Sequence, residues 1–225
     1  MLNIPVNIEN FAILLKGKSL EFFPQYKHNF NDCFVVSDYD DELKIIGKHL
    51  LGKNIIHFRN RGHESCLTKE NYYKFKIKYV QLGQVFRYNH FPLIRSYLYY
   101  LFFVRGVNVK FLPEQLRIFN DYFGEEYRLK FPNTGILSII FALEIFKPKN
   151  LWIFGLDFYE SDYFTKQIKN PIAHHPLEKR NEKMTRLNLE NYVEKIFKEY
   201  KNTNIKMCSY YSKWSTLDNM EILNK

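Results

Sequence analysis

The stretch that most constrains the fold runs from Phe131 to Tyr159, because it contains a complete loop–helix–strand–loop unit. Apolar residues recur at helical spacing from Ile136 to Phe146, which predicts a helix with one buried face. Lys147-Pro148 is expected to end this helix, since the residue before a proline avoids the α region. The apolar run Leu151–Phe154 then predicts a buried strand, so the stretch is one αβ unit of a layered fold.

Both ends of this unit carry residues suited to ligand binding. Asn133 and Thr134 are helix N-cap types, and Gly135 would let a ligand approach the first helical turn closely. A helix N-terminus offers unpaired N–H groups and a partial positive charge, which suits a phosphate. The strand is followed directly by Gly155, Asp157, Phe158 and Tyr159. Open α/β sheets bind their ligands at this end of their strands, although an αβ unit without a ligand is the alternative interpretation.

The alternation of strand-like runs and helical patterns continues over the whole chain. Further strands are predicted at Phe11–Leu15, Cys33–Ser37, Asn54–Phe58, Asn108–Phe111 and Asn204–Cys208. Helices are predicted at Glu42–Leu51, Phe91–Val104, Leu112–Phe123 and Arg186–Tyr200. We therefore expect an α/β fold with a single Rossmann-like, doubly wound and mainly parallel sheet, in one domain over residues 1–225. The polar segment from about residue 160 to 183 shows no period, which favours a lid.

The chain carries a formal net charge of +9, which favours an anionic partner such as a nucleotide, an acidic glycan, an anionic lipid surface or a nucleic acid. A lysine-rich solvated surface is the alternative explanation of this charge. Tyrosine and lysine alternate through Asn71–Tyr79, which predicts an amphipathic strand ending near Val80. Aromatic rings interleaved with lysines could instead stack single-stranded bases.

The cysteines and the apolar segments point to a cytoplasmic protein. Cys33 and Cys208 lie in apolar strand-like runs, so we expect buried thiols in a reducing compartment. The N-terminus lacks the basic and apolar regions of a secretory signal. The most apolar window, residues 91–104, contains Arg95 and is too short for a membrane span.

Two further loops follow predicted strands and carry polar side chains. Lys16-Gly17-Lys18-Ser19 is typical of the first phosphate-facing loop of a nucleotide-binding α/β fold, or of an ordinary β–α turn. It is not a P-loop, because the GxxxxGK(S/T) spacing is absent. Asp38 and Asp40 resemble the metal-binding DxD pair of many sugar-nucleotide transferases, but Asp40-Asp41-Glu42 is equally an acidic helix start.

The motif PNTGILSIIFAL, with the strand and the GLDFY that follow it, resembles the second conserved motif of sialyltransferases. It is similar to the bacterial family 42 enzymes and, more loosely, to the animal ones. The matching positions are Thr134-Gly135 at the helix start and Gly155–Tyr159 after the strand. The first loop also aligns without gaps to the Gly-x-Gly-Pro-Ser-Leu loop that opens the bacterial enzymes. Gly17, Ser19 and Leu20 match that loop, while Lys16 replaces an Asn and Lys18 replaces the Pro.

This resemblance implies roles for individual residues. The general base of the family is a lid histidine, here His175 or His174, and the two lid-hinge tyrosines that bind the leaving phosphate correspond to Tyr159 and Tyr163. His175 is preferred because HPLE also resembles the short His-x-x-Glu-type motif of the animal enzymes. The histidine pair could otherwise be surface polar residues or half of a metal site.

The substrate-binding set comes from the same resemblance and from the strand-end positions. Ser37, or Asp38 beside it, stands where the family has an Asn that contacts the nucleotide, and Asn60 falls near a second such position. Asp157 is expected either to accept backbone N–H bonds or to contact the nucleotide sugar. The predicted substrate-binding residues are Lys16, Gly17, Ser19, Ser37, Asp38, Asn60, Asn133, Thr134, Gly135, Gly155, Asp157 and Phe158.

The resemblance implies an inverting, metal-independent glycosyltransferase with a GT-A-like variant of the Rossmann-type sheet. It would transfer sialic acid or a related nonulosonic acid from a CMP-activated donor to a bacterial surface glycan such as lipooligosaccharide or capsule. No metal or other cofactor and no nucleic acid is expected as a partner, whereas peripheral contact with the anionic inner membrane face and a homo-oligomer are compatible with the sequence. The alternatives are a nucleotide-binding α/β protein without transfer activity and a nucleic-acid-binding module.

Overall fold

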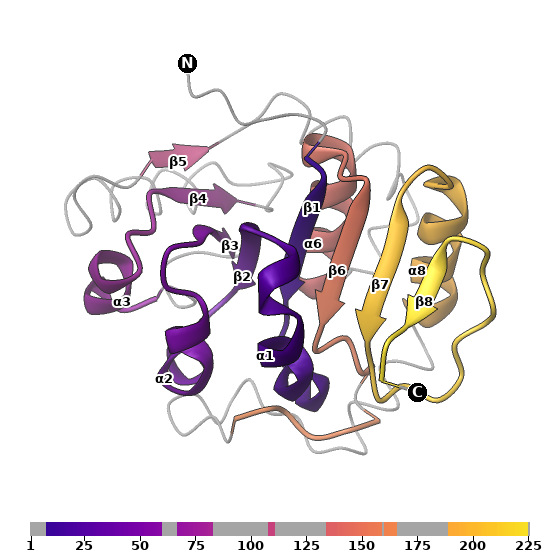
Figure 1. The fold of residues 1–225 in the computed structure, drawn as a ribbon, viewed down its shortest axis with the longest axis horizontal. Coiled ribbons are helices and arrows are strands. Elements are labelled where there is room, and N and C mark those ends of the chain that lie inside the picture. The colour runs from indigo at the N-terminus through magenta and orange to yellow at the C-terminus, as the bar shows by residue number, and fades with distance from the viewer. Residues whose placement is uncertain are drawn as a thin grey trace, which may run out of the picture.

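The protein is built on a parallel β-sheet. The computed structural model describes residues 8–59, 67–82, 108–110, 134–158, 160–165 and 189–224. Within these residues, strands form one eight-stranded sheet in the order β5-β4-β3-β2-β1-β6-β7-β8, and every neighbouring pair is parallel (Figure 1). The predicted α/β class with a mainly parallel sheet is therefore confirmed.

The central strands are short and almost entirely apolar. The strands are β1 (Asn10–Leu14), β2 (Asp32–Val36), β3 (Asn54–Arg59), β4 (Tyr79–Leu82), β5 (Asn108–Lys110), β6 (Asn150–Phe154), β7 (Asn204–Cys208) and β8 (Met220–Ile222). In β1, β2 and β6 every residue after the first is buried, as expected for strands covered on both faces. The sequence does not predict β8, because none of its three residues is fully buried and no apolar run marks it.

The helices are α1 (Phe23–Tyr26), α2 (Asp40–Ile46), α3 (Lys69–Lys74), α6 (Thr134–Phe141) and α8 (Leu189–Glu199). The 3-10 segments η1 (Lys18–Phe22), η2 (Lys27–Asn29) and η3 (Gly47–His49) precede or extend helices of the first half. A π-helical turn, η6 (Ala142–Phe146), continues α6. The helices predicted at residues 91–104 and 112–123 lie outside the described residues.

Helix α3 overturns the prediction of a strand through Asn71–Tyr79. Thr68 caps this helix, because its hydroxyl accepts a hydrogen bond from the backbone N–H of Asn71. Tyr72 and Phe75 are both buried, and their separation of three residues is a helical spacing. The chain becomes extended only at Tyr79, where β4 begins.

Helix α6 and its π turn carry the buried face that the sequence predicts. Ile136, Ile139, Ile140, Leu143 and Phe146 are all buried. The chain leaves the helix before Pro148, as predicted, through left-handed backbone at Lys147 with a φ of 45°. The Lys147 N–H donates to the Ala142 carbonyl, five residues earlier, at 3.2 Å, so the last turn is wider than an α turn.

Helices cover both faces of the sheet, which is therefore doubly wound as predicted. Alternate residues of β1 belong to different cores: Phe11 and Ile13 share one with buried residues of α6 and α8, whereas Ala12 and Leu14 share the other with α1, α2 and α3. In Figure 1, α6 and α8 lie behind the sheet and α1 lies in front of it.

The strand order contains one reversal. From β1 the chain adds β2, β3, β4 and β5 in turn on one side, and then returns to place β6 on the other side of β1. The loops that leave the carboxyl ends of β1 and β6 lie next to each other at this point of the sheet. Such a switch point is where doubly wound sheets bind ligands.

Cys33 and Cys208 are buried free thiols, as predicted, and burial raises the pKa of each to about 12. In the part of the chain that the structure describes, no helix has the length and apolar character of a membrane span.

Candidate functional site

A cavity of about 190 Å³ opens at the switch point between β1 and β6. Its lining comes from the loops after β1, β2 and β6, from the N-terminus of α6, and from residues 161–163. The predicted site residues that line it are Lys16, Gly17, Ser37, Thr134, Gly135, Gly155, Asp157, Phe158 and Tyr163. Parallel pairing brings these distant segments together, because it places the carboxyl ends of β1, β2 and β6 at one edge of the sheet.

A larger cavity, of about 620 Å³, lies near the amino ends of β2, β3 and β4. Its described lining includes Lys53, Lys74, Lys76 and Lys78. None of the predicted site residues is among the described residues that line it. We therefore assign the functional site to the smaller cavity, which lies at the edge where parallel sheets bind ligands.

Gly17 and Gly155 allow the loops after β1 and β6 to approach each other closely at the cavity. Gly155 has a φ of +82°, and a Cβ atom there would lie 2.8 Å from the carbonyl carbon and oxygen of Leu15. A Cβ atom on Gly17 would lie 2.6 Å from Gly155 O and 2.6 Å from Asp157 Oδ2. The N–H of Gly17 donates to Gly155 O at 3.0 Å, so the two loops are in direct backbone contact.

Asp157 ties three loops together. Its side chain accepts hydrogen bonds from the N–H of Ser19 at 2.9 Å, from the N–H of Tyr210 at 2.9 Å and from Ser161 Oγ at 2.7 Å. Of the two roles expected for Asp157, the structure shows the first, which is to accept backbone N–H bonds.

Ser19 is a structural residue rather than a lining residue. It is fully buried, and its hydroxyl donates to Asp157 and accepts from the N–H of Gly155 at 3.1 Å. The hydroxyl of Ser19 thus joins the loops after β1 and β6, and its substrate contact stays a prediction.

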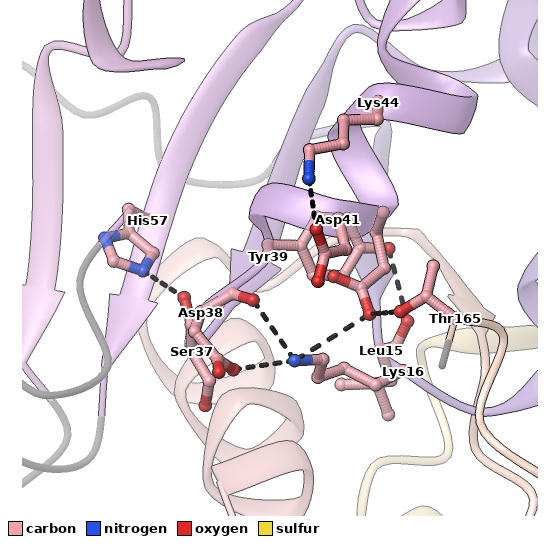
Figure 2. Close-up of polar contacts among 10 residues, drawn as sticks. Leu15, Lys16, Ser37, Asp38, Tyr39, Asp41, Lys44, His57 and Thr165 are labelled. Carbon is pink, nitrogen blue, oxygen red and sulfur yellow. Dashed lines mark hydrogen bonds and ion pairs between the residues drawn. The ribbon is translucent and has the colours of Figure 1, made fainter. Parts of the chain in front are cut away.

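Lys16 lies between two carboxylates at the side of the cavity formed by β1 and β2 (Figure 2). Its ammonium group is 2.6 Å from Asp38 Oδ1, donates to Asp38 O at 3.1 Å, and lies 3.7 Å from Glu42 Oε1. Thr165 Oγ1 donates to the same Glu42 oxygen at 2.7 Å. Burial raises the pKa of the Glu42 carboxyl, although the charge of Lys16 and the hydrogen bond from Thr165 act in the opposite direction.

The two aspartates of the DxD-like sequence have different partners. Asp38 contacts Lys16, whereas Asp40 Oδ1 accepts hydrogen bonds from the N–H of Thr68 at 2.8 Å and from Asn71 Nδ2 at 2.5 Å. Helix α2 begins at Asp40 and has three acidic residues in its first turn, which confirms the helix-start interpretation. Among the described residues, no group of three or more His, Cys, Asp or Glu side chains could hold a metal ion.

Ser37 lines the cavity in left-handed backbone, with a φ of 57° that is uncommon for a residue other than glycine. His57 Nε2 lies 2.6 Å from the Ser37 carbonyl oxygen, and His57 Nδ1 lies 2.5 Å from Tyr72 Oη. Because a carbonyl can only accept, Nε2 carries the proton and Nδ1 accepts from the tyrosine. Burial lowers the pKa of His57 to about 3, and the charge of Arg59 acts in the same direction, so the imidazole is neutral at pH 7.

Residues 160–165 run against the first loop. Gly17 and Tyr163 form an antiparallel bridge, with the N–H of Lys18 donating to Asp162 O at 3.0 Å and the N–H of Phe164 donating to Lys16 O at 2.9 Å. This pairing places Tyr163 at the cavity. The first residues of the predicted lid are thus fixed to the loop after β1.

Phe158 contributes to the cavity wall through a packed ring. Its centroid lies 5.0 Å from that of Tyr211 and 5.3 Å from that of Trp214, and its side chain is buried. The ring therefore shapes the wall and joins it to the core, rather than standing free for stacking.

Several predicted site residues lie outside the described residues, and their roles stay predictions. They are Asn60, Asn133, Tyr159, His174 and His175.

Other residues that organise the site were not assigned a role from the sequence. They are Glu42, His57, Tyr72, Ser161, Thr165 and Tyr210. One of them had a signal: His57 is the polar residue inside the apolar run Asn54–Phe58, and a buried polar side chain requires a hydrogen-bond partner. The others act through contacts between residues distant in the sequence, which local patterns do not reveal.

Neither a protein-family model nor a curated protein matches the sequence. Among solved structures, the sialyltransferase CstII from Campylobacter jejuni in complex with cytidine-5'-monophosphate is similar at a TM-score of 0.54 and 19% identity, over 96% of this chain and 85% of that chain. The fold is that of a sialyltransferase. CST-II in complex with a trisaccharide acceptor and CMP is similar at a TM-score of 0.54 and 18% identity, over 95% of this chain and 86% of that chain. A single-residue variant of CST-II with CMP gives a TM-score of 0.52 at 18% identity, over 95% of this chain and 85% of that chain. The resemblance inferred from the motifs is thereby confirmed at the level of the fold.

The arrangement of the cavity is suited to a compact anion. The N-terminus of α6, at Thr134 and Gly135, provides backbone N–H groups that the helix itself does not use. Lys16 contributes an ammonium group, and it is the one cationic residue among the described residues that line the cavity. A phosphate group has the size and charge that these donors bind.

Proposed function

We propose that the protein is an inverting, metal-independent glycosyltransferase that transfers sialic acid or a related nonulosonic acid from a CMP-activated donor. The observation that carries this proposal is the convergence of the first loop, the Thr134-Gly135 helix start and the Gly155–Phe158 loop on one cavity at the switch point. The CstII structures of the same fold contain CMP and, in one case, a trisaccharide acceptor, which supports a nucleotide donor and a glycan acceptor.

The proposed reaction is a single displacement at the anomeric carbon of the donor. His175, or His174, removes the proton from an acceptor hydroxyl as its oxygen bonds to the anomeric carbon and the bond from that carbon to the phosphate oxygen breaks. Tyr159 and Tyr163 donate hydrogen bonds to the leaving CMP phosphate, and the N-terminus of α6 adds N–H groups and partial positive charge. These donors act in place of a metal, which a monophosphate leaving group does not require.

The acceptor in this proposal is a bacterial surface glycan such as lipooligosaccharide or capsule. We place the protein in the cytoplasm, with its net charge of +9 favouring contact with the anionic inner membrane face. A homo-oligomer is part of the same proposal.

Thermal-shift titration separates the function classes. CMP is expected to raise the Tm, whereas GDP and a short oligonucleotide are expected to leave it unchanged. Transfer from CMP-sialic acid to a glycan should persist in EDTA, and should be abolished by only one of the variants His175→Ala and His174→Ala. Full activity in both variants would show that the base assignment is wrong.

A nucleotide-binding α/β protein without transfer activity is the second candidate. The observation that favours it is the ion pair between Lys16 and Asp38, since Lys16 stands where the resembled enzymes have an uncharged Asn. Stabilisation by CMP without transfer to any glycan would support this candidate.

A further inference from the structure

The charged cluster beside the cavity consists of Lys16, Asp38 and Glu42, and it contains one ammonium group for two carboxylates. A lysine ammonium has three donor positions. Two of them are directed to the side-chain and backbone oxygens of Asp38, and Glu42 lies on a further side at 3.7 Å. In this arrangement the positive charge of Lys16 is neutralised by the protein itself.

The cavity needs that charge if its ligand is an anion. Lys16 is the single cation among the described lining residues, whereas Asp157 and Asp162 line the cavity as well. An entering phosphate would therefore meet carboxylates and a lysine already held by Asp38. It can bind the ammonium group only by competing with the two acids of the cluster.

Asp38 and Glu42 can each lose the contact with the Lys16 ammonium group, for different physical reasons. The Asp38 side chain is 33% exposed, so water can replace the ammonium group there. Glu42 is fully buried, and its Oε2 atom has no hydrogen-bond partner among the described residues. Burial raises the pKa of Glu42, so this carboxyl can take up a proton when Lys16 turns away.

We propose that Asp38 and Glu42 are specificity-determining residues that hold Lys16 as a masked cation and release it to the phosphate of the nucleotide ligand. This inference rests on the proposed function for the identity of the nucleotide, but its core concerns only the phosphate. The two acids compete with every anionic ligand for Lys16, so they set how much a phosphate group adds to the affinity of a ligand at this cavity. A ligand without a phosphate gains nothing from Lys16.

Isothermal titration with CMP, cytidine and inorganic phosphate tests this inference. The variants are Asp38→Asn, Glu42→Gln and Lys16→Met, with Lys16→Met/Asp38→Asn as a charge-balanced version in case the single lysine variant does not fold. Asp41→Asn is the matched control, because Asp41 forms an ion pair of 2.5 Å with Lys44, three residues along on helix α2. It changes an acid of the same helix without touching the cluster.

Asp38→Asn is expected to raise the ratio of CMP affinity to cytidine affinity by about three- to tenfold, since a competing carboxylate is removed. Glu42→Gln should raise the ratio by a smaller factor, because its oxygen lies farther from the ammonium group. Either lysine variant should lower the ratio by about tenfold or more, the contribution of a charge-assisted hydrogen bond. The ratio in Asp41→Asn should equal that of the wild type.

The inference is overturned if Asp38→Asn leaves the ratio unchanged or lowers it, or if the lysine variants bind CMP as the wild type does. The titration with inorganic phosphate distinguishes failure of this inference from failure of the proposed function. Phosphate binding that depends on Lys16, without any binding of CMP or cytidine, would support the masked cation and refute the CMP site. No binding of CMP or phosphate to the wild type or to Asp38→Asn would refute the masked cation.

Discussion

Two buried carboxylates, Asp157 and Glu42, contact the first loop, and their surroundings are very different. Asp157 accepts hydrogen bonds from backbone N–H groups and hydroxyls, all of them neutral donors fixed by the fold. Glu42 has one hydroxyl donor, an ammonium group that it shares with Asp38, and one oxygen without a partner among the described residues. The comparison indicates that the contacts of Asp157 form a fixed scaffold, because its neutral donors have little tendency to bind an anionic ligand instead. The contacts of Glu42 are exchangeable, because the Lys16 ammonium group can bind an anionic ligand in its place.

The largest effect is expected on the scaffold side, from Gly155→Ala. A Cβ atom at this position would lie 2.8 Å from backbone atoms of Leu15, so the β1 and β6 loops would have to separate. We expect a loss of about 4 kcal/mol or more in the free energy of unfolding, measured by urea denaturation.

Gly52→Ala is the matched control for this substitution. Gly52 has a φ of +84°, close to that of Gly155, but a Cβ atom there meets nothing within 4 Å. It should lose only about 1–2 kcal/mol, the strain of left-handed backbone alone. Equal losses in the two variants would mean that the close contact of the two loops does not contribute to stability.

The second prediction compares how substitutions of the two carboxylates, Asp157 and Glu42, change the free energy of unfolding. Asp157→Ala leaves the N–H groups of Ser19 and Tyr210 without their acceptor, which should lower the free energy of unfolding by about 3 kcal/mol. Glu42→Gln keeps the contact with Thr165 and removes a buried charge, so it should raise stability at pH 7 by about 1 kcal/mol. If both variants lost a similar amount of free energy of unfolding, the distinction between the fixed contacts of Asp157 and the exchangeable contacts of Glu42 would be wrong.

The third prediction concerns the buried pair that holds Ser37. Tyr72→Phe removes the donor to His57 Nδ1, which should lower the free energy of unfolding by about 1–2 kcal/mol. Tyr73→Phe is the control, because Tyr73 is 58% exposed, and its loss should be within experimental error. If CMP binds, Tyr72→Phe should also weaken that binding, since the Ser37 carbonyl at the cavity depends on the imidazole.

The smallest expected effect is a pH dependence from Glu42. Burial raises the pKa of this carboxyl above its usual value of 4.5, so the folded state binds the proton more tightly than the unfolded state. The stability of the wild type relative to Glu42→Gln should therefore rise as the pH falls through the raised pKa, and should level off below pH 4.5. Urea denaturation of both proteins at a series of pH values measures this difference. A relative stability that falls toward acid would show that Lys16 dominates over burial.

His57 should act in the opposite direction. Its pKa is lowered from 6.5 to about 3, so the unfolded state takes up the proton first and stability is lost as the pH falls between these values. The comparison of wild type with Glu42→Gln cancels this contribution, since both proteins contain the histidine.

The sequence predicts the centre of the fold well and its periphery less well. Strands such as β1 and β6 are continuous apolar runs, so burial on both faces is visible in the residues themselves. Helix α3 was expected as a strand because alternation of Tyr and Lys conceals the spacing of Tyr72 and Phe75, and the capping by Thr68 decides the outcome. Strand β8 was not expected, because its existence depends on pairing with β7 rather than on its own composition.

The site divides in the same way. Lys16, Ser37 and Gly155 could be predicted, because each directly follows a recognisable strand and parallel topology gathers such positions at one edge. Glu42 and Thr165, which are 123 positions apart, could not be paired from the sequence, because only the tertiary structure brings a helix start to a loop after β6. The hydrogen bond between Ser19 and Asp157 could not be predicted for the same reason, since the two residues are distant in the sequence.

The close contact at Gly17 and Gly155 has a consequence for the recognition of distant relatives of this protein. Each glycine leaves empty the space that the backbone of the other loop occupies, so a side chain at either position is incompatible with the approach of the other. Relatives that keep this close contact between the two loops should carry glycine at both positions. The two short motifs, read together, can therefore identify them at levels of divergence where whole-chain identity no longer does.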